Sequence, residues 1–123
     1  MPLSNRAVLV LIAINGIAAV AFGAFAAHAV SDPDAQALLR TAAGYQLAHA
    51  AAGAAVLNRA RWGAFFMSLG ALVFAGSLYA LALLGMRWLG ALTPLGGLLM
   101  IAGWSVLLAH ALRSPESSIR KSA

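Results

Sequence analysis

The chain has 123 residues, of which 63% are hydrophobic and only 9% are charged, and its mean hydropathy is +0.89. Soluble domains carry about 25% charged residues, so this composition indicates a protein surrounded largely by lipid. The sequence has no cysteine, which excludes disulfides and thiolate chemistry, and its net charge of +5 is spread over single basic residues and pairs, a pattern that does not predict nucleic-acid binding.

The first predicted element is a membrane span over residues 7–30, which contain no Lys, Arg, Asp or Glu. A helix of this length rises about 36 Å, enough to cross a hydrocarbon core of about 30 Å. A signal peptide is the alternative, because Arg6 precedes the apolar run and Ala27, His28 and Ala29 match an A-x-A cleavage site. The apolar run is longer than the roughly 7–15 residues of such a peptide, so we expect an uncleaved span.

The second predicted span, 33–57, is weaker, because alanine dominates its sequence and gains little from contact with lipid. Its beginning is well marked, since Asp32 is a suitable N-cap and Pro33 suits the first helical position. Arg40 lies within this segment and can extend its charge toward the membrane surface. We therefore expect a membrane-spanning helix that its neighbours shield from lipid.

Two further apolar runs, 62–86 and 88–112, complete four predicted spans, and a short polar tail, 113–123, is expected in the cytoplasm without regular structure. The connections between the spans are short, which favours antiparallel neighbours. The sequence therefore predicts one domain, residues 1–123, with an all-α fold: an integral membrane four-helix bundle of up-down-up-down topology.

The distribution of Lys and Arg predicts the orientation in the membrane. Six basic residues fall on the side of the termini and two on the opposite side. Because cytoplasmic segments are enriched in Lys and Arg, both termini are expected in the cytoplasm. The six are Arg6, Arg59, Arg61, Arg113, Arg120 and Lys121, and the two are Arg40 and Arg87. The lipid bilayer is the partner that this pattern predicts.

Polar side chains inside the predicted spans are the candidate functional residues, because such groups are rare in membranes and usually face the protein interior. Tyr45, Gln46 and His49 share one helical face, and we expect His49 to bond across helices to the Gly90 carbonyl, to Thr93 or to Ser77. Two interpretations stay open: an outward-facing pocket around His49, or interhelical hydrogen bonds that fix the packing. The candidate pocket consists of His28, Tyr45, Gln46, His49, Ser77 and Thr93.

Small residues predict where helices approach one another closely. Pro94 has no N–H, so it releases the carbonyl of Gly90 from its helical hydrogen bond. The predicted packing residues are Gly44, Ala48, Ala52, Pro94, Gly96 and Gly97.

No metal or cofactor is predicted, because His28 and His49 have no carboxylate within the spans, and catalytic zinc usually takes three protein ligands.

Four segments carry a resemblance to a known family. They are GAFAAH at 23–28, TAAGYQLAHA at 41–50, FAGSLY at 74–79, and LGALTPLGG at 89–97, followed by Gly103-Trp104. In this order they resemble the YgdD-like family of small multipass membrane proteins, domain of unknown function 423, whose animal relatives are called transmembrane protein 256. The sequence departs from the family at Ala26 and Ala29, where glycine is typical, and lacks the usual aromatic residue before Thr41. The resemblance implies an uncleaved four-helix protein of the bacterial inner membrane, and it implies no activity.

The leading functional hypothesis is a non-enzymatic membrane protein that acts through helix packing, lipid or partner contacts, including a second copy of itself. The alternative is a small transporter or channel that uses the pocket around His49. No Asp or Glu lies inside any predicted span, which counts against proton exchange at an intramembrane carboxylate. An enzyme is the third possibility, but the sequence has no visible acid–base pair, so no catalytic residue is predicted.

Overall fold

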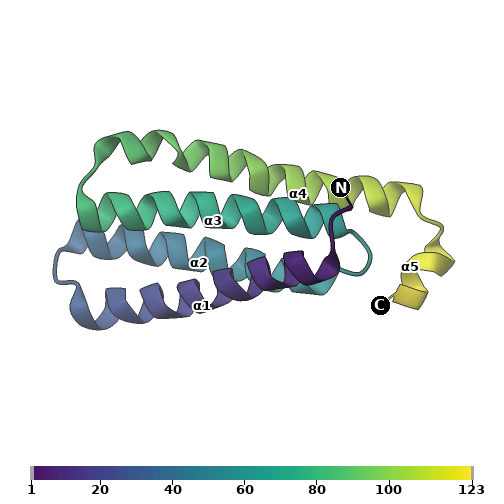
Figure 1. Ribbon diagram of the computed structural model, residues 1–123, viewed down its shortest axis with the longest axis horizontal. Helices are drawn as coiled ribbons and strands as arrows, with labels where there is room; N and C mark the ends of the chain where they lie inside the picture. Colours follow the sequence, from purple (N-terminus) through teal and green to yellow (C-terminus); the bar gives the residue numbers. More distant parts are fainter. Residues whose placement is uncertain (1, 123) are drawn as a thin grey trace.

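The computed structural model describes residues 2–122, which form helices joined by short connections and no strand (Figure 1). The all-helical prediction is confirmed. The helices are α1 (Asn5–Ala29), α2 (Pro33–Val56), α3 (Arg61–Leu84), the short 3-10 helix η1 (Arg87–Ala91), α4 (Thr93–Arg113) and α5 (Glu116–Ser122).

Three segments of the described chain are long and apolar enough to cross a bilayer, judged by length and composition. They are Asn5–Ala29, Arg61–Leu84 and Arg87–Arg113. The large apolar side chains of α1 and α4 are mostly exposed, which is the arrangement expected of helices whose outer faces contact lipid. These include Ile17, Val20, Leu98, Ile101 and Leu108.

Local chemistry sets the ends of the helices. The Ser4 hydroxyl caps α1 by accepting a hydrogen bond from Ala7 N (3.1 Å). The Asp32 carboxylate caps α2 by accepting from Ala35 N (2.9 Å), with Pro33 in the first turn as the sequence predicts. Gly85 ends α3 in the left-handed region (φ 69°), where glycine has no steric penalty.

The segment predicted as one span over 88–112 is not a single α-helix. Residues 87–91 form η1, and the regular α4 begins at Thr93. Leu89 N and Leu92 N bond to the carbonyls of Met86 and Leu89, the i to i−3 pattern of a 3-10 helix. Because Pro94 has no N–H, the α-helical ladder cannot continue back through this position.

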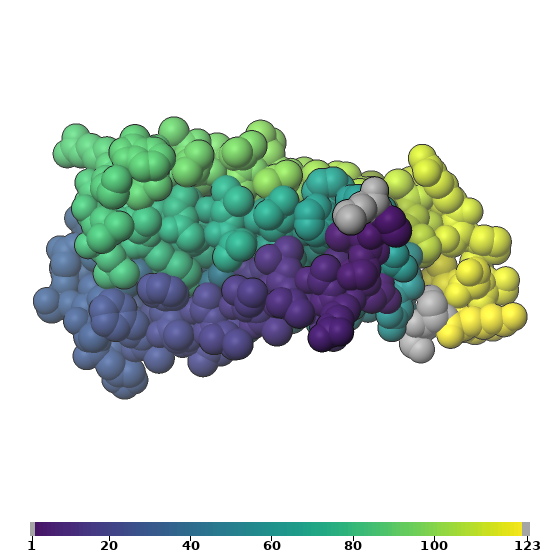
Figure 2. All heavy atoms as spheres, viewed as in Figure 1, coloured from purple at the N-terminus to yellow at the C-terminus, as the bar shows by residue number. Residues whose placement is uncertain are grey.

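The polar tail, predicted to lack regular structure, contains α5. The backbone N–H groups of Ser118 and Ile119 bond to the carbonyl of Pro115, and Glu116 occupies the first turn, where its charge complements the helix dipole. α5 lies beyond the end of α4 and projects past the other helices (Figures 1 and 2). The tail is therefore a separate short helix outside the apolar segments.

The four long helices lie side by side, with α3 in contact with all the others (Figure 1). Arg61 Nη1 donates to the carbonyl of Leu3 (2.6 Å), so α1 and α3 begin at the same end of the molecule. At the opposite end, Gln36 Nε2 donates to the carbonyl of Ala26 (2.9 Å), which joins the start of α2 to the last turn of α1. α2 therefore runs antiparallel to both α1 and α3 and over the same length.

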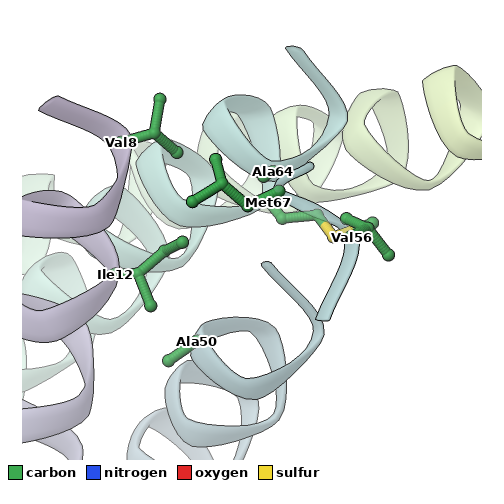
Figure 3. Close-up of a cluster of buried hydrophobic side chains, with 7 residues drawn as sticks. Val8, Ile12, Ala50, Val56, Ala64 and Met67 are labelled. Atoms are coloured by element: carbon green, nitrogen blue, oxygen red, sulfur yellow. The ribbon is translucent and has the colours of Figure 1, made fainter. Parts of the chain in front are cut away.

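Two apolar clusters fill the space between α1, α2 and α3. The first is Val8, Ile12, Ala50, Val56, Leu57, Ala64 and Met67, most of which Figure 3 shows. The second is Ala26, Leu39, Ala42, Ala75, Leu78 and Tyr79. Along each helix the two clusters occupy opposite halves, and the residues between them include buried polar side chains.

Glycines bring the backbones of α3 and α4 into direct contact. Gly70 and Gly63 on α3 face Gly96 and Gly103 on α4, so the two helices are antiparallel. A Cβ on Gly70 would lie 2.7 Å from the carbonyl oxygen of Gly96, and one on Gly103 would lie 2.8 Å from that of Gly63. The structure places Gly96 at this contact, but no atom lies within 4 Å of a Cβ built on Gly97. Of the predicted glycine pair, Gly97 is therefore not a packing residue within the described chain.

Gly96→Ala should destabilise the protein, because its methyl group would lie 2.8 Å from the carbonyl oxygen of Gly70 and meet the backbone of Phe74. Overpacking of this kind costs about 1–3 kcal/mol. Gly97→Ala is the matched control, since it changes the neighbouring glycine in the same helix where space is open. Denaturant unfolding of both variants in detergent micelles measures the difference, and equal stability of the two would contradict the contact.

Candidate functional site

Five polar side chains are buried among the four long helices: Asn15, Gln46, His49, Ser68 and Ser77. They come from α1, α2 and α3, at positions between or beside the two apolar clusters. Hydrocarbon offers no hydrogen bonds, so such groups need partners within the protein. Four of the five have side-chain hydrogen-bond partners, which divide them into three separate groups.

The first group is a continuous chain of hydrogen bonds through the interior. Tyr79 Oη on α3 donates to Gln46 Oε1 on α2 (2.6 Å), and Gln46 Nε2 donates to Asn15 Oδ1 on α1 (2.9 Å). Asn15 Nδ2 then donates to the carbonyl of Ser68 on α3 (2.9 Å) and to that of Leu11 on its own helix (3.0 Å). This series of hydrogen bonds thus begins and ends on α3 and passes through α2 and α1. We call it the polar chain.

Burial makes the polar chain inaccessible to solvent. Gln46 is 1% exposed, and Asn15 is fully buried. The ring of Phe22 on α1 stacks on Tyr79, with centroids 3.9 Å apart and planes 14° from parallel, which covers the phenol and fixes its direction. Both ends of both amides have partners of the correct kind, so the geometry assigns the orientation of each amide.

The second group links α2 to α4. Trp104 Nε1 donates to His49 Nε2 (3.0 Å), and His49 Nδ1 lies 2.7 Å from the carbonyl of Tyr45. An indole N–H can only donate and a carbonyl can only accept, so His49 carries its hydrogen on Nδ1 and is neutral in this arrangement. His49 faces the interior, as predicted, and is 8% exposed. The predicted partners were wrong, because Trp104 and Tyr45 occupy both ring nitrogens.

The third group links α3 to the beginning of α4. The hydroxyls of Ser77 and Thr93 lie 2.7 Å apart, and Ser77 also donates to the carbonyl of Phe74 (2.8 Å). Ser77 and Tyr79 bond to different helices, in agreement with their positions on opposite sides of α3.

The hydroxyl of Ser68 is buried without a hydrogen-bond partner in the described chain, and it lies beside Gly53, whose lack of a side chain leaves room for it.

The structure does not bring the predicted pocket residues together in one site. His28 is exposed near the end of α1, and the Tyr45 side chain is 52% exposed on α2. Gln46, His49 and the Ser77–Thr93 pair belong to the three different groups. Sequence reasoning did not assign Asn15, Tyr79 or Trp104 as partners, although the polar positions of the first two within apolar runs were visible.

The predicted packing stripe on α2 is also not an interface between helices of this chain. Gly44 and Ala48 are exposed, and nothing lies within 4 Å of a Cβ built on Gly44. Only Ala52 of the three packs against the first apolar cluster. Pro94 is exposed at the start of α4.

Within residues 2–122, no three side chains of His, Cys, Asp or Glu come together where they could hold a metal ion.

Comparison with known proteins places this architecture in a family. The family described as "Protein of unknown function (DUF423)" matches residues 22–97. The chain belongs to this family. The DUF423 match includes Gln46, Tyr79, Ser77 and Thr93, whereas Asn15 and Trp104 lie outside the matched residues.

Individual relatives match over most of their length. The chain is 37% identical to the UPF0382 inner membrane protein YgdD of Escherichia coli (strain K12), covering 95% of this chain and 98% of the relative. It is 36% identical to a UPF0382 membrane protein of Staphylococcus epidermidis (strain ATCC 12228), covering 85% and 94% of the two chains. No solved structure matches this DUF423 protein. The predicted family is therefore confirmed.

Tyr79→Phe should destabilise the protein, because it removes the donor to Gln46 Oε1 and leaves that buried oxygen unpaired. The expected cost is about 1–3 kcal/mol in the free energy of unfolding. Tyr45→Phe is the matched control, since it removes the same oxygen atom from a half-exposed ring one residue from Gln46. Unfolding in mixed micelles compares the two, and an equal effect would show that the Tyr79 hydroxyl contributes nothing particular.

Proposed function

We propose that this protein is a non-enzymatic, four-pass protein of the bacterial inner membrane that acts through helix packing and through contacts with lipid or with a protein partner. The observation that supports this most is the polar chain, in which Tyr79, Gln46 and Asn15 bond to one another and to backbone. Side chains whose donors and acceptors are already paired across helices stabilise the packing of those helices. The inner-membrane location is also the one stated in the name of the Escherichia coli relative.

The direction of α2 supports a fourth crossing. α1 and α3 are apolar enough to span the membrane and begin at the same end of the molecule. Only three residues separate α1 from α2, and only four separate α2 from α3. If α1 and α3 both cross in one direction, α2 must return through the same thickness. The four long helices then form the up-down-up-down array that the sequence predicts, with α2 stabilised by its neighbours despite its alanine content.

Charge supports the orientation. Arg6, Arg59 and Arg61 lie at the end where α1 and α3 begin, and Arg113 lies at the end of α4, which runs antiparallel to α3. Arg40 and Arg87 lie toward the other end. By the positive-inside rule the first end faces the cytoplasm, together with both termini.

The contacts of His49 favour packing over transport. A histidine that relays protons or ions needs access to water and a nitrogen free to exchange a hydrogen. Both ring nitrogens of His49 are within hydrogen-bonding distance of protein groups, and one of these groups belongs to another helix. The arrangement joins α2 to α4, which is the role assigned to it in this proposal.

Single cysteines test the four-pass arrangement directly, because the natural sequence has none. Ser31→Cys lies between α1 and α2, and Asn58→Cys lies between α2 and α3; both positions are exposed. A membrane-impermeant maleimide should label Ser31→Cys in spheroplasts and label Asn58→Cys only after lysis. Labelling of both cysteines from the same side of the membrane would refute the crossing of α2.

A further inference from the structure

An open groove of about 440 Å³ lies on the outer surface of α2. It is lined by Arg40, Thr41, Gly44, Tyr45, Ala48 and His49. No other long helix covers this face, because α4 packs on α3 and makes few contacts with α2 among the described residues. The groove contains the small-residue positions that the sequence predicts as a helix contact, and within this chain they face outward.

Arg40 is the only charged residue that lines the groove. It is exposed, and no carboxylate among residues 2–122 forms an ion pair with it. The acids nearest in sequence, Asp32 and Asp34, stand at the start of α2, where Asp32 caps the helix. Arg40 is seven residues beyond Pro33, which places its Cα about 10 Å along the helix from that end. A guanidinium at this depth extends toward the headgroups, and it needs an anionic partner.

The floor of the groove suits an apolar chain. Gly44 and Ala48 are one helical turn apart. Gly44 has no side chain and Ala48 has only a methyl group, so together they leave a continuous track along α2. Tyr45 forms one wall, and its ring is held by neighbouring rings, 5.1 Å from Phe74 and 6.4 Å from His49 between centroids. The groove therefore combines a cation at headgroup depth with an apolar track that leads toward the middle of the membrane.

We infer that this groove is a binding site for one anionic phospholipid of the leaflet at the Asp32 end. Arg40 pairs with the lipid phosphate, since guanidinium and phosphate match in charge and geometry. One acyl chain lies over Gly44 and Ala48 beside Tyr45. This inference rests on the proposed four-pass arrangement, because the groove faces lipid only if α2 crosses the membrane.

Native mass spectrometry tests the site after the protein is reconstituted in nanodiscs of phosphatidylethanolamine and phosphatidylglycerol and released into mild detergent. The share of protein that retains a phosphatidylglycerol should fall about fivefold in Arg40→Gln, as expected for the loss of one basic residue at an anionic surface. Gly44→Leu should also lower retention, because its side chain fills the track while Arg40 is kept. Arg40→Lys should lie between Arg40→Gln and the natural protein in retention, since it keeps the charge but loses the planar fork of guanidinium N–H donors.

Arg87→Gln is the matched control. Arg87 is exposed and lies toward the same end of the molecule as Arg40, but it does not line the groove. Equal retention in Arg40→Gln and Arg87→Gln would overturn the inference. A dimer that Gly44→Leu dissociates, with lipid retention unchanged, would overturn it too and assign the face to a second copy. Cysteine labelling at Ser31 and Asn58 reports on the four-pass arrangement separately, so a failure of the lipid site alone is distinguished from a failure of the four-pass arrangement.

Discussion

The hydrogen bonds at the two ends of the Gln46 side chain set the relative positions of α1, α2 and α3. Gln46 accepts from Tyr79 and donates to Asn15, which in turn donates to the α3 backbone. In an apolar environment each of these groups has no alternative partner, so rotating or sliding one helix would leave at least one of them unpaired. The two apolar clusters on either side follow from this alignment, because their residues occupy the same helices a few turns away. The polar groups set how α1, α2 and α3 are aligned along one another, and apolar side chains fill the space around these groups.

α4 is held by a different kind of contact. Its glycines meet the backbone of α3 directly, and two side-chain links, Ser77–Thr93 and His49–Trp104, secure it near its start and farther along its length. A direct contact between backbones tolerates little added side-chain volume, and it does not need large apolar side chains at the interface. One consequence is that α4 lies over α3 and leaves the outer face of α2 uncovered. The groove below Arg40 and the exposed Gly44 and Ala48 both result from this placement.

The sequence predicted the helices better than the contacts between them. Charge-free runs and the Asp32-Pro33 signal located the beginnings of α1, α2 and α3 closely, because local chemistry decides those, whereas the predicted fourth span begins as η1 and becomes α4 only at Thr93. The partners of Gln46 are Asn15 and Tyr79, which are 31 and 33 residues away on other helices. Helical periodicity places a residue on a face without saying which neighbour that face meets. For the same reason Gly44 and Ala48 were expected at a helix contact: a small-residue stripe has the same sequence pattern whether it faces a helix or lipid. At Pro94 the lost hydrogen bond was foreseen, but the 3-10 helix over Arg87–Ala91 was not.

The most direct test of the central role of the polar chain is a double-mutant cycle on the bond between Gln46 and Tyr79, with Gln46→Leu, Tyr79→Phe and the combined variant. The free energy of unfolding of each is measured in the same micelles. If the two side chains act as one unit, their coupling energy should be about 0.6–1.7 kcal/mol, which runs from the average to the maximum found by double-mutant cycles for interhelical hydrogen bonds in a helical membrane protein. Strict additivity of the two substitutions would contradict the claim that this bond helps to align α2 with α3.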